Sequence, residues 1–192
     1  MPRLFETFVR NFLRRHLPEA RVTARQLAWD AQGDTAEAQA LLPVMKTDVT
    51  LEWGNERCVV LDCKFYANSF TQSFDQAKLK SANLYQIAAY LHHHPYRSKG
   101  VPMHGVLLYP AVGADFLHHY DFMGHRLTVA SVDLLERWQT IHDRLLQVVR
   151  TTERPERAAT AELVDLDAEL VMTQSLKQGM TQRPFAGMPG HI

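Results

Sequence analysis

The stretch Lys46–Phe65, KTDVTLEWGNERCVVLDCKF, decides the fold because it reads as two apolar strands joined by a tight turn. Successive side chains of a strand point to opposite faces. In the second strand, Leu61 and Cys63 therefore share one face, whereas Asp62 and Lys64 share the other. The pattern predicts a buried strand that carries one acid and one base on the same side.

The turn between the two strands contains Gly54 and Asn55, a pair typical of tight hairpins. The strands should therefore be antiparallel neighbours. In the first strand, Asp48 lies on the face opposite to the apolar side chains. We expect Asp48 and Asp62 to meet on one face of the sheet, with Lys64 beside them.

Composition limits the possible classes of protein. The 192 residues include 21 basic and 21 acidic ones, so any affinity for nucleic acid must come from a local patch. Cys58 and Cys63 fall on opposite faces of one strand, which argues against a disulfide between them and fits a reducing, cytoplasmic setting. We expect no membrane association, because no apolar run reaches the ~20 residues of a membrane span.

The rest of the chain alternates between helical and strand patterns. We expect helices over residues 3–16, 80–94 and 132–149, a weak strand over 21–29, hairpin strands over 41–53 and 57–66, a polar loop over 67–78, a strand over 103–109 ended by Pro110, and a hairpin formed by 116–122 and 126–130. This order predicts an α/β fold with a small central mixed sheet flanked by helices.

The C-terminal part changes in character after residue 150. We expect residues 1–150 to form one domain, residues 151–178 to form a helical extension with an amphipathic helix over 156–176, and residues 179–192 to be a flexible tail.

Asp48, Asp62 and Lys64 suit metal-assisted hydrolysis of a phosphodiester. Carboxylate oxygens bind Mg²⁺, which uses few protein ligands because it keeps several waters and takes substrate oxygens. Asp48 and Asp62 are candidate ligands, and the Cys63 carbonyl can join them. Lys64 can either help the attacking water or neutralise the phosphate, and the sequence leaves both roles open. An exposed ion pair between Asp62 and Lys64 is the structural alternative.

Four places in the sequence carry a resemblance to a nuclease family. They are Leu4-Phe5-Glu6 with Phe8-Val9, Thr47-Asp48, Asp62-Cys63-Lys64, and Gln86 with Tyr90. In order and spacing they resemble the PD-(D/E)XK nuclease superfamily, and within it the nuclease domains of the McrC family from modification-dependent restriction systems. Thr47 stands where that pattern usually has proline. The likeness covers roughly residues 3–135.

The resemblance implies a restriction-endonuclease-like core and a catalytic set of Asp48, Asp62 and Lys64. It also implies Glu6 as an auxiliary acid, with Gln86 and Tyr90 supporting the site from a helix. From the residues alone, Glu6 can equally be an acid favoured by the helix dipole. The basic stripe of Arg3, Arg10 and Arg14 is a candidate phosphate-binding surface, or else a solvated helix face.

The function implied is a metal-dependent DNA endonuclease, the cleavage component of a McrBC-like system of restriction and antiviral defence. Mg²⁺ is the expected cofactor, with Mn²⁺ as a substitute. DNA, a second copy of the chain and an AAA+ GTPase motor are the expected partners. McrC-like proteins carry a further N-terminal region that engages the motor, whereas here the nuclease helix starts almost at Met1. Alternatives are a non-catalytic DNA-binding or assembly module and a DNA-repair exonuclease or nickase.

Overall fold

The computed structural model describes residues 2–65, 78–111 and 116–150. Contacts within the chain define two units, Met1–Thr152 and Glu153–Ile192. The expected loop over 67–78 and the C-terminal extension and tail therefore lie largely or wholly outside the described residues. In the described part, no helix combines the length and the apolar character needed to cross a membrane.

A mixed sheet of six strands forms the centre of the first unit, in the order β1-β4-β5-β6-β8-β7. Its strands are β1 (Arg21–Thr23), β4 (Val49–Trp53), β5 (Arg57–Cys63), β6 (Met103–Ala111), β7 (Leu117–Phe122) and β8 (His125–Asp133). β5, β6 and β8 are parallel, and the other neighbours pair antiparallel. The predicted α/β fold with a mixed sheet is confirmed.

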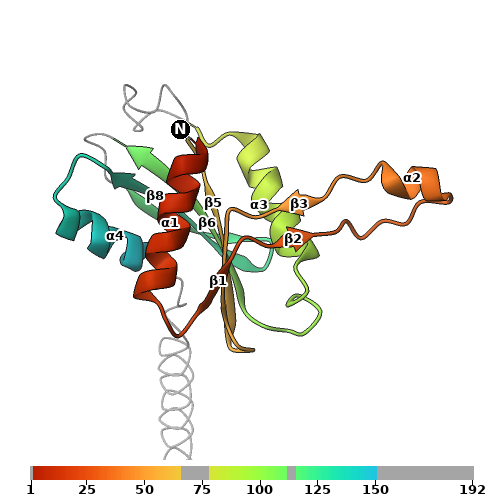
Figure 1. Ribbon diagram of the computed structural model, residues 1–192, viewed down its shortest axis with the longest axis horizontal. Coiled ribbons are helices and arrows are strands. Elements are labelled where there is room, and N and C mark those ends of the chain that lie inside the picture. The colour runs from red at the N-terminus through yellow and green to blue at the C-terminus, as the bar shows by residue number, and fades with distance from the viewer. Residues whose placement is uncertain (1, 66–77, 112–115, 151–192) are drawn as a thin grey trace, which may run out of the picture. The chain divides into compact units, whose positions relative to one another are not determined.

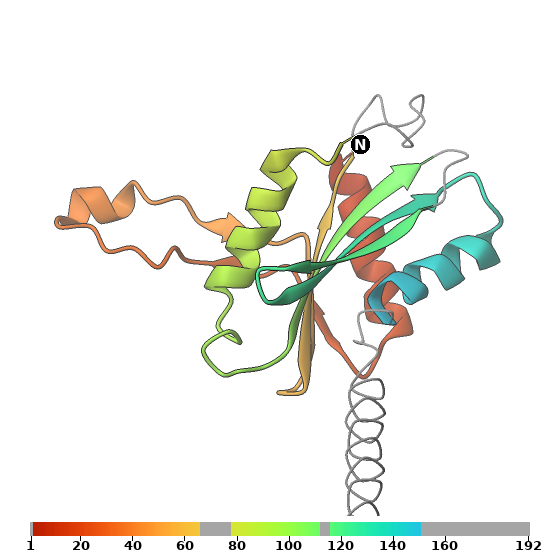
Figure 2. The same cartoon turned by 180° about the vertical axis from the view of Figure 1, so that it is seen from behind.

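Helices cover both faces of this sheet. α1 (Pro2–His16) and α4 (Trp138–Arg150) lie on one face, and α3 (Ser81–His93) lies on the other (Figures 1 and 2). α3 connects β5 to the parallel strand β6, so it returns across the sheet from the end of β5. Its N-terminal turns consequently lie near the carboxyl end of β5.

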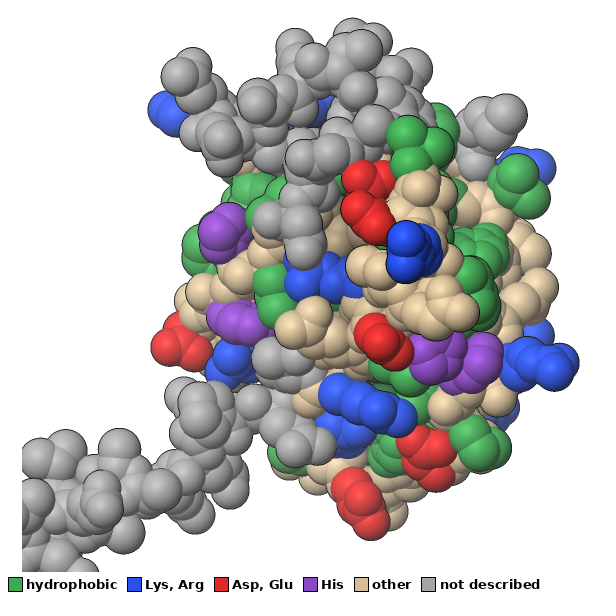
Figure 3. Space-filling view, turned by 90° about the vertical axis from the view of Figure 1, so that its left-hand side faces the viewer, with side chains coloured by type: hydrophobic (Ala, Val, Ile, Leu, Met, Phe, Trp, Pro, Cys, Tyr) green, Lys and Arg blue, Asp and Glu red, His purple; other side chains and the backbone are tan. Residues whose placement is uncertain are grey.

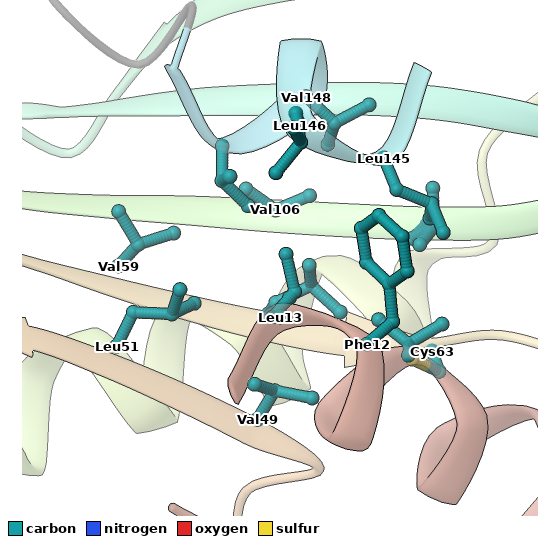
Figure 4. Close-up of a cluster of buried hydrophobic side chains, with 14 of the residues drawn as sticks. Phe12, Leu13, Val49, Leu51, Val59, Cys63, Val106, Leu145, Leu146 and Val148 are labelled. Carbon is teal, nitrogen blue, oxygen red and sulfur yellow. The ribbon is translucent and has the colours of Figure 1, made fainter. Parts of the chain in front are cut away.

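The predicted alternation along β4 and β5 accounts for the larger of the two cores. Val49, Leu51 and Cys63 face α1 and α4, where they pack with Phe12 and Leu13 (Figure 4). Thr50, Glu52, Val60 and Asp62 belong to the other face by the same alternation. Cys58 and Cys63 are free and lie on opposite faces, as predicted.

The hairpin between β4 and β5 is also confirmed. Leu51 pairs with Val59, and Glu56 N–H donates to the Trp53 carbonyl across the turn. Gly54 has a φ of +52°, a left-handed conformation in which a side chain is disfavoured.

The strand predicted over residues 41–53 is wrong in its first half. An arm between β1 and β4 projects from the sheet and contains three short elements (Figures 1 and 2). These are β2 (Gln26–Leu27), α2 (Ala36–Ala40) and β3 (Met45–Lys46). Thr35 caps α2 by accepting a hydrogen bond from Ala38 N–H, and Leu41 ends that helix instead of starting a strand. The weak strand expected over 21–29 is likewise divided between β1 and β2.

The helix predicted over residues 132–149 begins six residues later, at Trp138. Val132 and Asp133 instead complete β8, where they pair with Pro110 and Ala111 of β6. A strand partner thus overrides the apolar spacing that favoured a helix. Exposed Leu135 lies in the connection between β8 and α4.

Pro110 does not end its strand, contrary to expectation. Lys64 N–H donates to the Leu108 carbonyl, so the backbone groups of Leu108, and of Pro110 two residues later, point toward β5. The paired residues of β5 and β6 end at Cys63 and Leu108, so Pro110, which has no N–H, lies beyond them.

Candidate active site at the carboxyl end of β5

The candidate site forms where β4 begins and β5 ends. Cys63 N–H donates a 2.7 Å hydrogen bond to Oδ2 of Asp48, which holds that carboxylate beside the last residues of β5. Asp62 is buried, with 1% of its surface exposed, and forms an ion pair with Lys64. The structure therefore brings Asp48, Asp62 and Lys64 together as predicted, and the exposed ion pair considered as an alternative does not describe it.

The Cys63 carbonyl faces the same way as its N–H. Both groups of one strand residue point to the same neighbouring strand, and the N–H points to Asp48. This carbonyl thus lies on the side of Asp48, as the proposed third oxygen ligand requires.

α3 supports Lys64 through a chain of hydrogen bonds. Lys64 Nζ donates to Gln86 Oε1 at 2.6 Å, and Gln86 Nε2 donates to the Tyr90 hydroxyl at 2.6 Å. The Tyr90 hydroxyl in turn donates to the Lys46 carbonyl at 2.8 Å. Gln86 and Tyr90, four residues apart on one helix face, therefore link β5 to the residues just before Asp48.

The first helix reaches the site through Arg10 and Glu6. Arg10 NH1 donates to the Asp48 carbonyl at 2.9 Å and so fixes the start of β4. Glu6 lines the same cavity as Asp48, and its negative charge contributes to raising the pKa of Asp48. Glu6 is the fifth residue of α1, beyond the first turn in which the helix dipole acts most strongly.

The three predicted phosphate-binding arginines divide into two groups. Arg3 and Arg10 line the cavity beside Asp48. Arg14 lies farther along α1, where its guanidinium contacts Asn11 Oδ1 and the Val22 carbonyl. In this structure Arg14 is thus separate from the cavity lining.

Burial perturbs both carboxyl groups, and the charge of Asp62 adds to the shift of Asp48. Burial, followed by the charge of Asp62, raises the pKa of Asp48 to about 7. Burial also raises the pKa of Asp62, although the hydrogen bond from Lys64 opposes the shift. A nearby cation stabilises the ionised form of two neighbouring carboxylates that have lost most of their water.

The donor set fits a hard divalent cation that keeps water or substrate ligands. Asp62 Oδ2 is buried and forms the ion pair with Lys64. Within residues 2–65, 78–111 and 116–150, no three His, Cys, Asp or Glu side chains form a ready metal cage. A site with two carboxylates leaves other coordination positions of the ion to water or substrate. Such a site suits Mg²⁺ better than a structural zinc ion, which needs four protein ligands.

Sequence reasoning missed Thr47 as a structural part of the site. Thr47 is buried, and its N–H donates to the Arg25 carbonyl at 2.9 Å. Its hydroxyl accepts from Arg25 N–H at 2.9 Å and lies 2.8 Å from the Thr50 hydroxyl. Thr47 thus ties the base of the arm to β4, with a backbone donor that a proline at this position would lack.

The sequence also gave no signal for a buried polar network behind the site. Glu52 forms an ion pair with Arg25 and lies 3.9 Å from Nε2 of His94. The same His94 nitrogen is 3.7 Å from Cys58 Sγ. These residues come from β1–β2, β4, β5 and the end of α3, so only the tertiary fold brings them together.

Comparison with known proteins gives the family. A family model described as McrBC 5-methylcytosine restriction system component matches residues 1–110, a range that contains every residue of the site. The chain belongs to this family.

Two similar proteins show how much of a McrBC component is present. The Type IV methyl-directed restriction enzyme EcoKMcrBC of Escherichia coli (strain K12) is 33% identical over 148 residues, which cover 77% of this chain and 42% of that protein. The chain thus spans less than half of this McrBC relative. A chain in a refined half-complex of Thermococcus gammatolerans McrB AAA+ hexamers with bound McrC matches with a TM-score of 0.49 and 17% identity, over 80% of this chain and 33% of that one.

Proposed function

We propose that this McrBC family member is a metal-dependent endonuclease that hydrolyses phosphodiester bonds of DNA, as the cleavage component of its restriction system. The observation that carries the proposal is the cluster of buried Asp62, half-buried Asp48 and Lys64 at the carboxyl end of β5. Buried charges are costly unless they are paired or hold a ligand, and open α/β sheets bind ligands at the carboxyl ends of their strands.

Asp48, Asp62 and the Cys63 carbonyl would hold Mg²⁺, or Mn²⁺ in its place. When bound, the ion neutralises charge on the phosphate and lowers the pKa of the attacking water. The fit rests on the chemistry of the donors, since two carboxylates and a carbonyl suit a hard cation, and on the raised pKa values of both acids.

Lys64 presents its ammonium to the reacting groups. Its contacts with Asp62 and Gln86 orient Nζ, which donates to the attacking water or to a phosphate oxygen. Tyr90 positions Gln86, so the helix determines where the Lys64 ammonium lies. Glu6 acts as an auxiliary acid that shares or tunes the metal site from α1.

A cleavage assay tests this function directly. The purified 192-residue chain should cut DNA with Mg²⁺ or Mn²⁺ and stop in EDTA. Asp62→Ala and Lys64→Ala should each lower the rate by about 10²-fold or more, the usual scale for loss of a proton-transfer or charge-stabilising group. Lys99→Ala, at an exposed site outside this cluster, is the matched control. Full cutting by a correctly folded Asp62→Ala protein would overturn the proposal.

A non-catalytic DNA-binding or assembly module is the second candidate. The lack of a three-side-chain metal cage among the described residues favours it. Calorimetric titration with Mn²⁺ in the presence of DNA distinguishes the two. Saturable binding that Asp48→Asn removes supports the nuclease, and no binding at millimolar metal supports the module.

We further propose an AAA+ motor of the McrB type as a partner and a dimer of this chain on DNA. The Thermococcus gammatolerans match is described as McrB AAA+ hexamers with bound McrC, and a double-strand cut needs two copies of a single active site. Light scattering with DNA and Mg²⁺ should show a second copy joining the complex. A strictly monomeric chain that makes double-strand breaks would contradict the dimer.

A further inference from the structure

A cavity of about 430 Å³ opens beside Asp48, between α1 and the end of the arm. It is lined by Arg3, Glu6, Thr7, Arg10, Lys46, Thr47 and Asp48. Lys46 and Thr7 have no part in the metal site proposed above. The cavity therefore extends the site beyond its two metal-binding acids.

The cationic side chains of this cavity are not neutralised by the acid next to them. Glu6 is placed three residues after Arg3 and four before Arg10, the spacing of helix-surface ion pairs. Within the described residues, neither Arg3 nor Lys46 makes a side-chain hydrogen bond or ion pair, and Glu6 makes none with either arginine. Arg10 uses one donor on the Asp48 carbonyl and retains others, since a guanidinium has five.

The protein as a whole has no bias toward either sign of charge. The face shown in Figure 3 carries Lys, Arg, Asp, Glu and His side chains interspersed with one another. The whole chain has equal numbers of acids and bases. The cavity lining thus brings three cations together with two acids, Glu6 and Asp48, a local excess of positive charge of the kind a neutral protein needs to bind a polyanion.

We propose that this cavity binds the DNA phosphate next to the one that is cut. The inference rests on the proposed nuclease function and adds Lys46 and Thr7 to Arg3 and Arg10 as its binding residues. Asp48 is shared by the metal site and the cavity wall, so a strand whose scissile phosphate lies at Asp48 and Asp62 continues directly into the cavity. Consecutive phosphates of one strand advance by about 3.4 Å along the duplex axis, which keeps the neighbouring phosphate close by.

The arrangement links binding to alignment of the cut strand. Arg10 contacts both the cavity and the backbone of Asp48, and the Lys46 carbonyl receives the Tyr90 hydroxyl. A phosphate held by Arg10 and Lys46 is therefore attached to the same backbone segment that positions the metal-binding acid. The cavity would fix the register of the strand relative to Asp48 and Lys64.

The salt dependence of DNA binding tests the site without any cleavage. Binding of the full chain to a fluorescent duplex is measured by anisotropy in EDTA over a range of salt concentrations. Lys46→Gln and Arg3→Gln should each weaken binding and reduce the slope of log K against log salt by about 0.9. Arg15→Gln makes the same charge change at an exposed site of α1 outside the cavity, and should leave the slope unchanged. Unchanged slopes for both cavity variants, or an equal loss with Arg15→Gln, would overturn the site.

A second measurement identifies which phosphate is bound. Single methylphosphonates, which lack the phosphate charge, are placed on either side of a mapped cut. Single-turnover cleavage by the wild-type chain should slow at one neighbouring position, and the Lys46→Gln variant should lose this sensitivity. Equal sensitivity in both proteins would overturn the assignment. If the chain never cuts, the salt slopes still decide whether the cavity binds a DNA phosphate, while the nuclease proposal and the position of that phosphate next to a cut both fail.

A small free anion that carries phosphate could occupy the same cavity as a DNA phosphate. Inorganic phosphate and a nucleoside triphosphate are titrated separately as competitors of the fluorescent duplex. Neither should compete at micromolar concentration if the site is built for a DNA strand. Micromolar binding of either anion that Lys46→Gln abolishes would reassign the cavity to a small-molecule phosphate and overturn the DNA proposal.

Discussion

The backbone N–H of Cys63 donates a 2.7 Å hydrogen bond to Oδ2 of Asp48, so the end of β5 positions the acid at the start of β4. This bond favours the ionised form of Asp48, but burial and the charge of Asp62 outweigh it and raise the pKa to about 7. Near neutral pH, the metal-free site therefore keeps Asp48 partly protonated. A bound cation would relieve this repulsion. The two acids therefore lower the stability of the metal-free protein and favour binding of a metal ion.

Asp48→Asn should remove metal binding and stabilise the metal-free protein. The native pKa of Asp48 is above the ordinary value of 3.8, so between about pH 4 and 7 the folded state binds more protons than the unfolded state. The stability of the wild-type protein consequently falls as the pH rises through this range. The variant has no carboxyl group at this position, so this fall is absent from its stability. Urea unfolding in EDTA at several pH values should show the variant's advantage growing up to about pH 7.

The exposed acid Asp34 on the arm provides the control. Asp34→Asn should follow the wild-type pH profile and retain Mn²⁺ binding. Parallel pH profiles for wild type and Asp48→Asn would show that Asp48 is not strained in the metal-free protein.

Tyr90→Phe should weaken both folding and cleavage. The change leaves the Lys46 carbonyl and the Gln86 amide without the hydroxyl they share, which costs about 1–3 kcal/mol where the partners are buried. Movement of Gln86 also displaces the Lys64 ammonium, and a displacement of about 1 Å can lower the rate by up to about 10²-fold. Tyr85→Phe, at an exposed tyrosine of the same helix, should change neither quantity. Calorimetry and single-turnover rates check both effects, and an unchanged kcat would contradict the positioning role.

The meeting of Asp48, Asp62 and Lys64 was predictable because it depends on local rules. Alternation along β5 gives the shared face of Asp62 and Lys64, and the four-residue spacing of Gln86 and Tyr90 gives their contact on α3. Thr47, Arg25 and His94 were not predictable in their roles. Their contacts join segments far apart in sequence, and the arm that separates β1 from β4 has only two-residue strands, too short to show a period.

His94 should make the protein sensitive to acid. Its Nδ1 accepts from Tyr96 N–H, whereas Nε2 faces Glu52 and Cys58. Burial and, next, the charge of Arg25 lower the pKa of His94 from 6.5 to about 4. Between these values the unfolded state binds more protons, so this contribution to stability is complete above about pH 6.5 and is lost as the pH falls toward 4.

His94→Gln should remove that part of the acid sensitivity. Free energies of unfolding measured from pH 7 to pH 4 should fall less steeply for this variant than for wild type. The exposed His92 on the same helix supplies the control, because His92→Gln should keep the wild-type slope. A wild-type slope in His94→Gln would mean that other groups, such as His104, whose pKa is also lowered to about 4, dominate the acid response.

Gly105→Ala should show how closely α3 must pack against β6 for the site to work. A Cβ at Gly105 would lie 2.9 Å from Cγ1 of Ile87 and 3.2 Å from Cδ1 of both Leu91 and Leu127. Such overpacking costs about 1–3 kcal/mol and pushes the helix that carries Gln86 away from the sheet. We expect a lower melting temperature and slower cleavage. Adding Ile87→Ala removes the contacted Cγ1, so the double variant should be less destabilised than the sum of the two single variants. Full activity of Gly105→Ala at wild-type stability would show that the position of α3 is not set by this contact.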